Sequence, residues 1–558
     1  MVLFRTALHL FGVLLIVSLT ACGGGGGGST SDSSSTSDSS ASAGDTTIPT
    51  VSLTPVNGAT GVDTAATVLA SFNEDMFAST IDGGSFTLSN SSGEVSATVN
   101  FDATNNIATL TPSSSLALLS NYTASLINNI TDLFGNALDA TSASFTTRDG
   151  VWGTAELIET DNVGVALSAD VAFDKSGNAI AVWHQHDGVR ENIWANRYVL
   201  GSGWGTAELI ENNNTGPARY AKVVFDGNGN AIVVWQQNDG LRENIWTNRY
   251  EVNVGWGTPM PIETDDNGEA TVPHVASDDA GNVIAVWNHS EDYTSVFSTR
   301  SFWASRYVSA TGWGTPELIE SGSGSVWGAD IALDGNGNAM AVWPQYDGAA
   351  ESPYVNRYVA GVGWGTEELL ETDSAFDASN VRIAINDNGQ AIAVWQQQSD
   401  IWANSYVVGT GWGAAERIES DSFGAYVPDI AIDSSGNAIA VWSQSSSSGI
   451  VNRANYYEAG VGWGTEEVIF DDGFTPRITM DSQGNAIVVS GQYSANPSNM
   501  QAIRYTSGVG WGTAELIEAS DAGSASSPDV ALDAKGRAIV VWSQSDGTRE
   551  NIHANRFE

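Results

Sequence analysis

The chain has 558 residues with 65 acidic and 21 basic side chains, a formal net charge of -44, one cysteine and 20 tryptophans. A chain this acidic repels phosphate backbones, so no nucleic-acid partner is expected. One cysteine allows neither an intrachain disulfide nor a cysteine-based zinc site. Because 42% of the residues are hydrophobic and 15% charged, most of the chain can bury a core, and its length suggests two to four domains.

The first 21 residues have the features of a secretory signal peptide: one positive charge precedes an apolar run too short to span a membrane. The only cysteine, Cys22, follows Leu19-Thr20-Ala21, and this stretch resembles the lipobox of bacterial lipoproteins. The resemblance implies cleavage before Cys22, acylation of that residue and a membrane anchor. Gly23 follows in place of an aspartate, which favours the outer membrane or the cell surface. The alternative is an ordinary secretory signal with an incidental cysteine.

Residues 22–47 are predicted to form a flexible tether after the lipidated cysteine. Six consecutive glycines lead into a stretch of serine, threonine, aspartate and alanine. Such a segment buries too little apolar surface to offset its ordering entropy.

Residues 48–149 contain alternating apolar segments separated by turn residues, as in residues 95–101 and 107–111. This pattern and a length of about 100 residues are typical of an Ig-like β-sandwich. Six motifs resemble the bacterial Ig-like domain of the surface-layer (SbsA) type; they lie at residues 55–62, 72–76, 110–112, 121–122, 132–136 and 145–147. The resemblance implies a structural spacer of exported proteins without catalytic residues.

Residues 150–558 are an eightfold repeat marked by a Trp-Gly pair. The pair recurs at Trp152, Trp204, Trp256, Trp313, Trp364, Trp412, Trp463 and Trp511. Each unit contains four strand-length segments and no room for a helix, which is the signature of a β-propeller blade. The first Trp-Gly segment, residues 152–159, precedes the first complete unit, and the sequence ends after the third segment of the last one. The predicted fold is therefore all-β: an Ig-like sandwich, then eight four-stranded blades closed by strand 152–159.

The first turn of each unit is nearly constant, whereas the second loop varies from the long insert 288–302 to the short connection 396–400. In a four-stranded antiparallel blade these turns lie on opposite faces of the disc. The uniform face is expected to be scaffold and the varied face the place of recognition.

Three second loops share the pattern Asp-Gly-x-Arg-Glu-Asn and belong to units that become consecutive once the ring closes. Their arginines and glutamates could form bidentate hydrogen bonds to a sugar, and the nearby tryptophans could stack on it. The candidate ligand-binding residues are Arg190, Glu191, Trp194, Arg242, Glu243, Trp246, Arg549 and Glu550. The alternative is that the arginine and glutamate of each loop pair with each other in solvent.

Other recurring residues favour structural interpretations. A repeated arginine on the third segment, such as Arg197, is matched by a repeated glutamate on the fourth, such as Glu208, which predicts cross-strand ion pairs within each blade. The turns at Asp226 and Asp334 resemble calcium loops but lack the later carboxylate, so hydrogen-bonded turns are predicted. No cofactor is expected, with calcium as the weaker alternative.

Catalytic motifs are missing from the sequence. The six histidines occupy no repeated position and form no metal-binding pair, and no nucleophile elbow or phosphate loop is present. The chain is therefore expected to be a monomeric, non-catalytic binding or adhesion module that is anchored at Cys22 and recognises a glycan or a surface protein. One alternative is an extracellular polysaccharide hydrolase or lyase, since acidic pairs are abundant. The other is a structural envelope lipoprotein.

Overall fold

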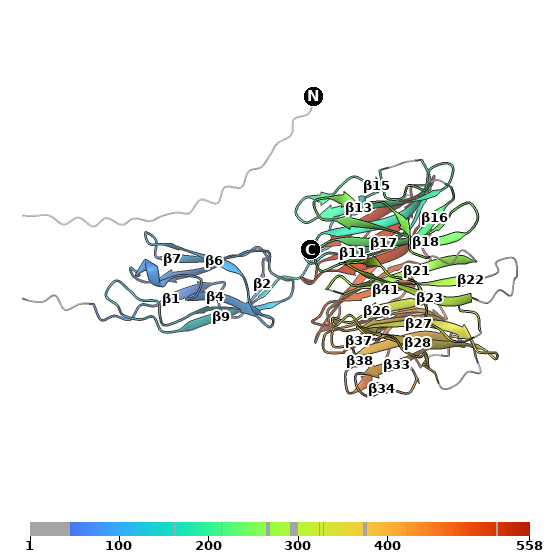
Figure 1. Cartoon of the computed structure of the whole chain (residues 1–558). Helices are drawn as coiled ribbons and strands as arrows, with labels where there is room; N and C mark the ends of the chain where they lie inside the picture. Colours follow the sequence, from blue (N-terminus) through green and yellow to red (C-terminus); the bar gives the residue numbers. More distant parts are fainter. Residues whose placement is uncertain are drawn as a thin grey trace, which may run out of the picture.

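The computed structural model describes residues 45–160, 163–213, 215–263, 268–278, 280–290, 300–322, 324–326, 328–371, 376–420, 422–519 and 523–558. The predicted signal peptide, Cys22 and most of the predicted tether lie outside these residues. The described part consists of β-strands, turns and one 3-10 helix, η1 (Ala78–Thr80), which confirms the all-β class. In this part no helix is long and apolar enough to cross a membrane. Figure 1 shows the first nine strands as a separate lobe beside the repeat region.

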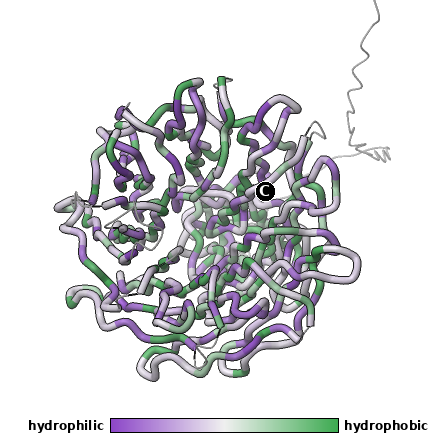
Figure 2. Tube along the Cα trace, turned by 90° about the vertical axis from the view of Figure 1, so that its right-hand side faces the viewer, coloured by the Kyte–Doolittle hydropathy of each residue, from purple (hydrophilic) through white to green (hydrophobic). Residues whose placement is uncertain are grey.

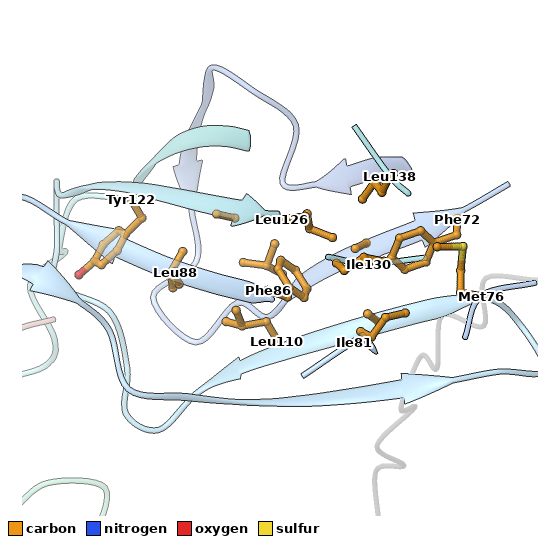
Figure 3. Close-up of a cluster of buried hydrophobic side chains, with 14 of the residues drawn as sticks. Phe72, Met76, Ile81, Phe86, Leu88, Leu110, Tyr122, Leu126, Ile130 and Leu138 are labelled. Atoms are coloured by element: carbon orange, nitrogen blue, oxygen red, sulfur yellow. The ribbon is translucent and has the colours of Figure 1, made fainter. Parts of the chain in front are cut away.

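Two sheets form the first lobe. Its strands are β1 (Val51–Thr54), β2 (Ala59–Val62), β3 (Val68–Phe72), β4 (Phe86–Asn90), β5 (Gly93–Glu94), β6 (Ala97–Asp102), β7 (Ile107–Pro112), β8 (Asn121–Leu126) and β9 (Thr141–Thr147). One sheet has the order β1-β3-β7-β6 and the other β2-β9-β8-β4-β5. Apolar side chains such as Phe86, Leu110 and Ile130 are fully buried between them (Figure 3). The alternating pattern seen in the sequence thus builds a sandwich core.

The repeat region contains eight antiparallel sheets, here called blades 1 to 8 in chain order. The first strands are β11 (Ala166–Phe173), β16 (Ala218–Phe225), β21 (Glu269–Ser277), β26 (Asp330–Leu333), β31 (Ala378–Ile385), β36 (Ala425–Ile432), β41 (Phe474–Met480) and β46 (Ala525–Leu532). The second strands are β12 (Ala179–His186), β17 (Ala231–Asn238), β22 (Val283–Ser290), β27 (Ala339–Tyr346), β32 (Ala391–Gln397), β37 (Ala438–Ser446), β42 (Ala486–Gly491) and β47 (Ala538–Ser545). The third strands are β13 (Glu191–Val199), β18 (Glu243–Glu251), β23 (Arg300–Val308), β28 (Glu351–Val359), β33 (Asp400–Val407), β38 (Gly449–Glu458), β43 (Met500–Thr506) and β48 (Glu550–Phe557).

The fourth strand of each blade is broken, which corrects the prediction of a continuous segment such as 152–159. Two short pieces pair with the same third strand, separated by the residues that follow Trp-Gly. The pieces are β14 (Gly203–Trp204), β15 (Glu208–Leu209), β19 (Gly255–Trp256), β20 (Met260–Pro261), β24 (Gly312–Trp313), β25 (Glu317–Leu318), β29 (Gly363–Trp364), β30 (Glu368–Leu369), β34 (Gly411–Trp412), β35 (Glu416–Arg417), β39 (Gly462–Trp463), β40 (Glu467–Phe470), β44 (Gly510–Trp511) and β45 (Glu515–Leu516). In blade 8 the corresponding pieces are β10 (Glu156–Leu157) and a bridge between Trp152 and Phe557.

The blades follow one another around an axis. Each first strand contacts the first strand of the next blade, and β46 of blade 8 contacts β11 of blade 1. Strand β10, from the start of the repeat region, pairs with β48 at its end. In Figure 2, which is turned by 90° from Figure 1, the repeat region has a round outline. Sheets of this kind and order fit propeller blades.

Buried tryptophans of the second strands hold neighbouring blades together. In blade 1 the Trp183 indole Nε1 donates to Gln185 Oε1 (3.0 Å), and Gln185 Nε2 donates to the buried Glu159 Oε2 (3.0 Å) at the end of the preceding blade. The same chain of bonds recurs in blades 2, 4, 5 and 8; its tryptophans are Trp235, Trp343, Trp395 and Trp542. Each indole donor is therefore satisfied within its own strand, and each glutamine reaches a glutamate of the preceding blade.

The repeated arginines also act between blades, which corrects the prediction that they pair within a blade. Arg197 lies 5.5 Å from the ring centroid of Tyr250 in the next blade. Equivalent cation–π contacts join Arg249 to Tyr307, Arg306 to Tyr358, Arg357 to Tyr406, Arg504 to Phe557 and Arg556 to Tyr198. An ion pair of the predicted kind is present in blade 8, between Arg556 and Glu156 at 2.9 Å. The partner that recurs for these six arginines is therefore an aromatic ring of the next blade and not the glutamate of the same blade.

Candidate functional site

The Ig-like lobe contacts the face of the repeat region that carries the constant first turns. The backbone N–H of Leu118 donates to the carbonyl of Lys535 in the first turn of blade 8 (2.9 Å). Lys535 Nζ donates to Ser115 O (2.6 Å), and Leu118 is buried in a cluster with blades 7 and 8. We call this side the constant face and the opposite side, which carries the second loops, the variable face. In Figure 1 the lobe lies at the left of the repeat region, so the variable face lies at the right.

Each blade has a residue in the left-handed region at the same position, which lies on the first strand or, in blade 4, two residues before it. These residues are Ser168, Tyr220, Val272, Gly328, Asn380, Val427, Thr475 and Ser527, with φ between 52° and 68°. The register with the second strand shifts at this point, for example between Leu167 and Asp170, as in a β-bulge. Left-handed backbone is costly for residues with a Cβ, particularly for β-branched ones. Its recurrence in all eight blades indicates a requirement of the architecture.

Two residues beyond the bulge, each first strand contributes to what we call the axial ring. Its members are Asp170, Lys222, His274, Asp330, Arg382, Asp429, Arg477 and Asp529. The four aspartates each accept a hydrogen bond from a backbone N–H of the next blade, at 2.8 to 3.0 Å. Lys222 Nζ lies 2.7 Å from Asp170 Oδ1. The ring therefore consists of acidic and basic groups that link consecutive blades around the axis.

Burial and neighbouring charge shift several pKa values in the axial ring. Burial and the carboxylate of Asp170 raise the pKa of Asp529 to about 6. Burial would lower the pKa of Lys222, but the carboxylates of Asp170 and Asp529 raise it above its usual value. The His274 pKa is lowered by burial despite its contact with Asp330 (Nδ1 to Oδ1, 3.7 Å). The ring thus contains a carboxyl group that titrates close to neutral pH.

A cavity of about 290 Å³ lies on the axis, and we call it the axial pocket. It is lined by Ser168, Ala169, Tyr220, Ala221, Lys222, Val272, Pro273, His274, Thr475, Arg477, Ser527, Pro528 and Asp529. The first strands run from the variable to the constant face, so the bulge residues form its mouth on the variable face and the axial ring its floor. Tyr220 is 45% exposed at the mouth. At the floor, the Nη1 atom of Arg477 is buried and has no hydrogen-bond partner in the described part of the chain.

Tyr220 connects the axial pocket with the second loop of blade 1. Its ring centroid lies 6.0 Å from that of the buried His184. The preceding residue, Arg219, forms a 2.8 Å ion pair with Glu191 of that loop. Burial lowers the pKa of His184 to about 4; the charge of Glu191 opposes the shift and that of Arg219 adds to it. One wall of the pocket is therefore continuous with a predicted ligand-binding loop.

The three predicted loops are turns closed by their own aspartates. In blade 1 Asp187 Oδ1 accepts the backbone N–H groups of Val189 (2.7 Å) and Arg190 (2.9 Å). Asp239 and Asp546 do the same for the backbones of Arg242 and Arg549. These hydrogen bonds fix the loop backbone, and in blade 8 the Arg549 side chain also donates to Asn551 Oδ1 at 2.9 Å.

The structure does not bring the predicted side chains of one loop together. Glu191 pairs with Arg219 of the next blade, whereas Trp194 packs against the preceding blade. In blade 2 Glu243 accepts a hydrogen bond from Asn238 Nδ2 (3.3 Å), and Trp246 packs against blade 1. Burial raises the pKa of both Glu243 and Glu550. Ligand binding by these loops stays a prediction, and the axial pocket is a site that the sequence analysis missed.

The signal that would have revealed the axial ring lies in the repeat. Between apolar residues on every first strand, one position is occupied by Asp, Lys, His or Arg in all eight units. A charged residue at one place in eight buried strands indicates a polar axis. The bulge residues leave no such signal, because Ser, Tyr, Val, Asn and Thr share no side-chain property.

The turns that resemble calcium loops are closed by their own hydrogen bonds. Asp226 Oδ1 accepts the backbone N–H groups of Asn228 and Asn230, both at 2.9 Å, and Asp226 Oδ2 accepts Asn230 Nδ2 at 2.8 Å. Carboxylate oxygens of Asp45, Glu74 and Asp132 lie within 4.8 Å of one another in the Ig-like lobe. Calcium binding stays the weaker alternative.

Comparison with known proteins assigns the first lobe. Residues 45–147 match the family model of the bacterial Ig-like domain. No curated protein matches the chain. A protein of unknown function from Dyadobacter fermentans is 11% identical with a TM-score of 0.37, over 74% of this chain and 99% of that one. A polysaccharide lyase described as an ulvan lyase is 11% identical (TM-score 0.42; 66% and 95%), and a fucose-specific lectin from Aleuria aurantia 13% identical (TM-score 0.31; 56% and 97%). The chain therefore contains a bacterial Ig-like domain, followed by eight antiparallel sheets that fit propeller blades.

Proposed function

We propose that this chain is a monomeric, lipid-anchored binding protein of the outer membrane or cell surface. In this proposal its eight blades form a closed β-propeller, and an SbsA-type Ig-like domain holds the propeller away from the anchor at Cys22. The contact of β46 with β11 and the pairing of β10 with β48 support closure. The contact of the Ig-like domain with the constant face supports an orientation in which the variable face points away from the anchor.

The proposed ligand is a glycan, bound non-catalytically at the axial pocket and the loops around it. The observation that carries this proposal is the position of the pocket at the centre of the variable face, with an exposed aromatic ring at its mouth and hydrogen-bonding side chains at its floor. A sugar matches such a lining because it offers an apolar ring face together with hydroxyl groups. The Glu191–Arg219 pair extends the polar surface toward the second loop of blade 1.

A glycan array probed with the full chain, with and without calcium, tests the proposal. Tyr220 has a left-handed backbone (φ 57°), so Tyr220→Asn removes the ring at low conformational cost, and Tyr220→Phe keeps it. We expect binding to be lost in the first variant and retained in the second. An Arg190→Ala, Arg242→Ala, Arg549→Ala triple variant tests the predicted loops separately. No glycan binding in either condition would overturn the proposal and favour a protein partner or a structural role.

A second candidate function is that of a polysaccharide hydrolase or lyase, and the raised pKa of Asp529 favours it. A carboxyl group with a pKa of about 6 in a pocket has the proton affinity required of a general acid near neutral pH. Polysaccharide cleavage, followed by reducing ends or by unsaturated products, is the test. Activity that disappears in Asp529→Asn while the array profile persists would identify an enzyme.

A further inference from the structure

The blade junctions contain a repeated seat for a carboxylate, distinct from the axial pocket. A seat consists of a third-strand arginine of one blade and the aromatic ring below it in the next blade. These arginines lie near the ends of the third strands that approach the constant face. Six junctions of the described structure contain an arginine over a ring, with 4.8 to 6.0 Å from the guanidinium carbon to the ring centroid.

Three of these six seats already contain a carboxylate of the chain itself. Arg249 donates to Glu251, two residues further along the same strand. Arg556 Nη1 donates to Glu558 Oε1 at 2.9 Å, and the same oxygen accepts Tyr198 OH at 3.1 Å. Both glutamates occupy the second position after the arginine, so the two seats are filled in the same way.

The third seat is filled by the segment that joins the Ig-like domain to blade 8. Arg504 Nε lies 3.1 Å from Asp149 Oδ1. The next residue, Gly150, lies so close to the Phe557 ring that an added Cβ would be 2.4 Å from a ring carbon. This seat therefore accommodates two groups at the same time: a carboxylate against the arginine and the Gly150 backbone against the aromatic ring.

The other three seats have no such carboxylate. At the second position after Arg197, Arg306 and Arg357 stand Val199, Val308 and Val359. Within the described structure the guanidinium groups of Arg197 and Arg357 have the ring contact and neither a hydrogen bond nor an ion pair. Arg306 donates to Asn282 Oδ1 at 2.5 Å, but its Nε is buried without a partner. Each of these cations is held over an aromatic ring and lacks the carboxylate present in the filled seats.

Room for a ligand is evident at two junctions. Between blades 2 and 3 a cavity of about 450 Å³ is lined by Arg249, Tyr307 and Trp313. The equivalent cavity between blades 6 and 7, about 380 Å³, is lined by Tyr456, Tyr505 and Trp511. Its position is the same, although tyrosine replaces the arginine. The first cavity belongs to the filled seat of Arg249, and Glu251 lines it as well.

We infer that the seats at Arg197, Arg306 and Arg357 bind the carboxylate of an acidic sugar residue, a hexuronate. The guanidinium and the tyrosine hydroxyl bind the carboxylate together, as Arg556 and Tyr198 bind Glu558. The seat filled by the linker has Phe557, whereas the three open seats have Tyr250, Tyr358 and Tyr406. The filled seats of Arg249 and Arg556 also have tyrosines, Tyr307 and Tyr198, so the choice of a sugar acid over an acidic peptide rests on the proposed glycan function. Three equivalent seats on one chain would increase the avidity for a polymer of repeating acidic residues.

Calorimetric titration of the full chain with galacturonate tests this inference. We expect saturable binding at up to three equivalent sites and at least tenfold weaker binding of neutral galactose. A Val199→Glu, Val359→Glu double variant should lose two of the three sites, because it copies the filled seats of blades 2 and 8 and keeps both arginines. Val407→Glu is the matched control, since blade 5 has Ser405 in place of the arginine. This control adds the same charge and should bind as the unmodified chain does.

Two results would overturn the inference: unchanged galacturonate binding by the double variant, or no binding by the unmodified chain. Tighter binding of an acetylated Asp-Gly amide than of galacturonate would overturn the sugar as ligand class and identify acidic peptides instead. Far-UV circular dichroism and thermal unfolding of each variant show whether the fold is intact. None of these substitutions touches the axial pocket, so the outcome is independent of the Tyr220 variants.

Discussion

The carboxylate of Asp529 accepts a hydrogen bond from the backbone N–H of Val171 at 2.9 Å, across 358 residues of sequence. Asp529 belongs to blade 8 and Val171 to blade 1. Within the ring, Asp170 makes the same bond to Val223 at 2.8 Å. The junction between the last and the first blade is thus built with the bond that joins blades 1 and 2.

Asp529→Ala is expected to destabilise the chain by about 1–3 kcal/mol, because it leaves the Val171 N–H without its acceptor. Asp529→Asn keeps an acceptor oxygen and should cost less. Urea unfolding gives the free energies, and hydrogen exchange at the Val171 amide locates the effect. Unchanged protection of this amide in Asp529→Ala would show that the contact between blades 8 and 1 does not depend on the bond.

Gln185 is expected to be more sensitive to truncation than an ordinary buried polar residue, because it joins Trp183 to Glu159 of another blade. Gln185→Ala leaves the buried indole N–H of Trp183 without its acceptor and removes one donor from the buried Glu159 carboxylate, which should cost about 2–4 kcal/mol of unfolding free energy. Gln185→His should cost less, since blade 3 has the pair Trp287 and His289 at these positions. Chemical unfolding of both variants makes the comparison, and equal losses would contradict the assigned role.

The repeat predicted the strands and turns because each element recurs eight times with its periodicity intact. The role of Arg197 was predicted wrongly because the cross-strand rule treats a blade in isolation, whereas its nearest ring, Tyr250, belongs to the next blade. The break in the fourth strand comes after Trp-Gly and has no period-two signature. The axial pocket was missed because bulge residues as unlike as Tyr220 and Val272 show no common property before folding.

Acid should destabilise the chain partly through His184. Its pKa is lowered from 6.5 to about 4 in the folded state, so the unfolded chain binds more protons between these values. The stabilising contribution of neutral His184 is complete above about pH 6.5 and is lost as the pH falls toward 4. His184→Gln, the residue found at the equivalent Gln236, should remove this part of the acid sensitivity. Melting temperatures measured at pH 7 and pH 4.5 test this prediction, with His186→Gln as the control. If the melting temperature of His184→Gln drops as much between these pH values as that of the unmodified chain, the prediction is wrong.

Gly150→Ala should loosen the connection between the Ig-like domain and blade 8. The added Cβ would lie 2.4 to 2.9 Å from three carbon atoms of the Phe557 ring, so Asp149 and the ring could not keep their positions. Gly153→Ala is the matched control, because its Cβ would meet its nearest neighbours at 3.4 and 3.5 Å. Limited proteolysis should cut near residue 150 faster in the first variant than in the second. Equal rates would show that the linker seat tolerates the methyl group.

The chain leaves the Ig-like domain at Asp149 and enters the closing strand of blade 8 within a few residues, pairing Val151 with Glu558 and Gly153 with Arg556. This strand runs from the constant face toward the variable face. A mechanical pull on the Ig-like domain, directed away from the constant face, therefore acts along the strand. Its hydrogen bonds to β48 would be loaded together in shear instead of being peeled one after another. The load would therefore be shared by the hydrogen bonds that join residues 151–158 to residues 552–558.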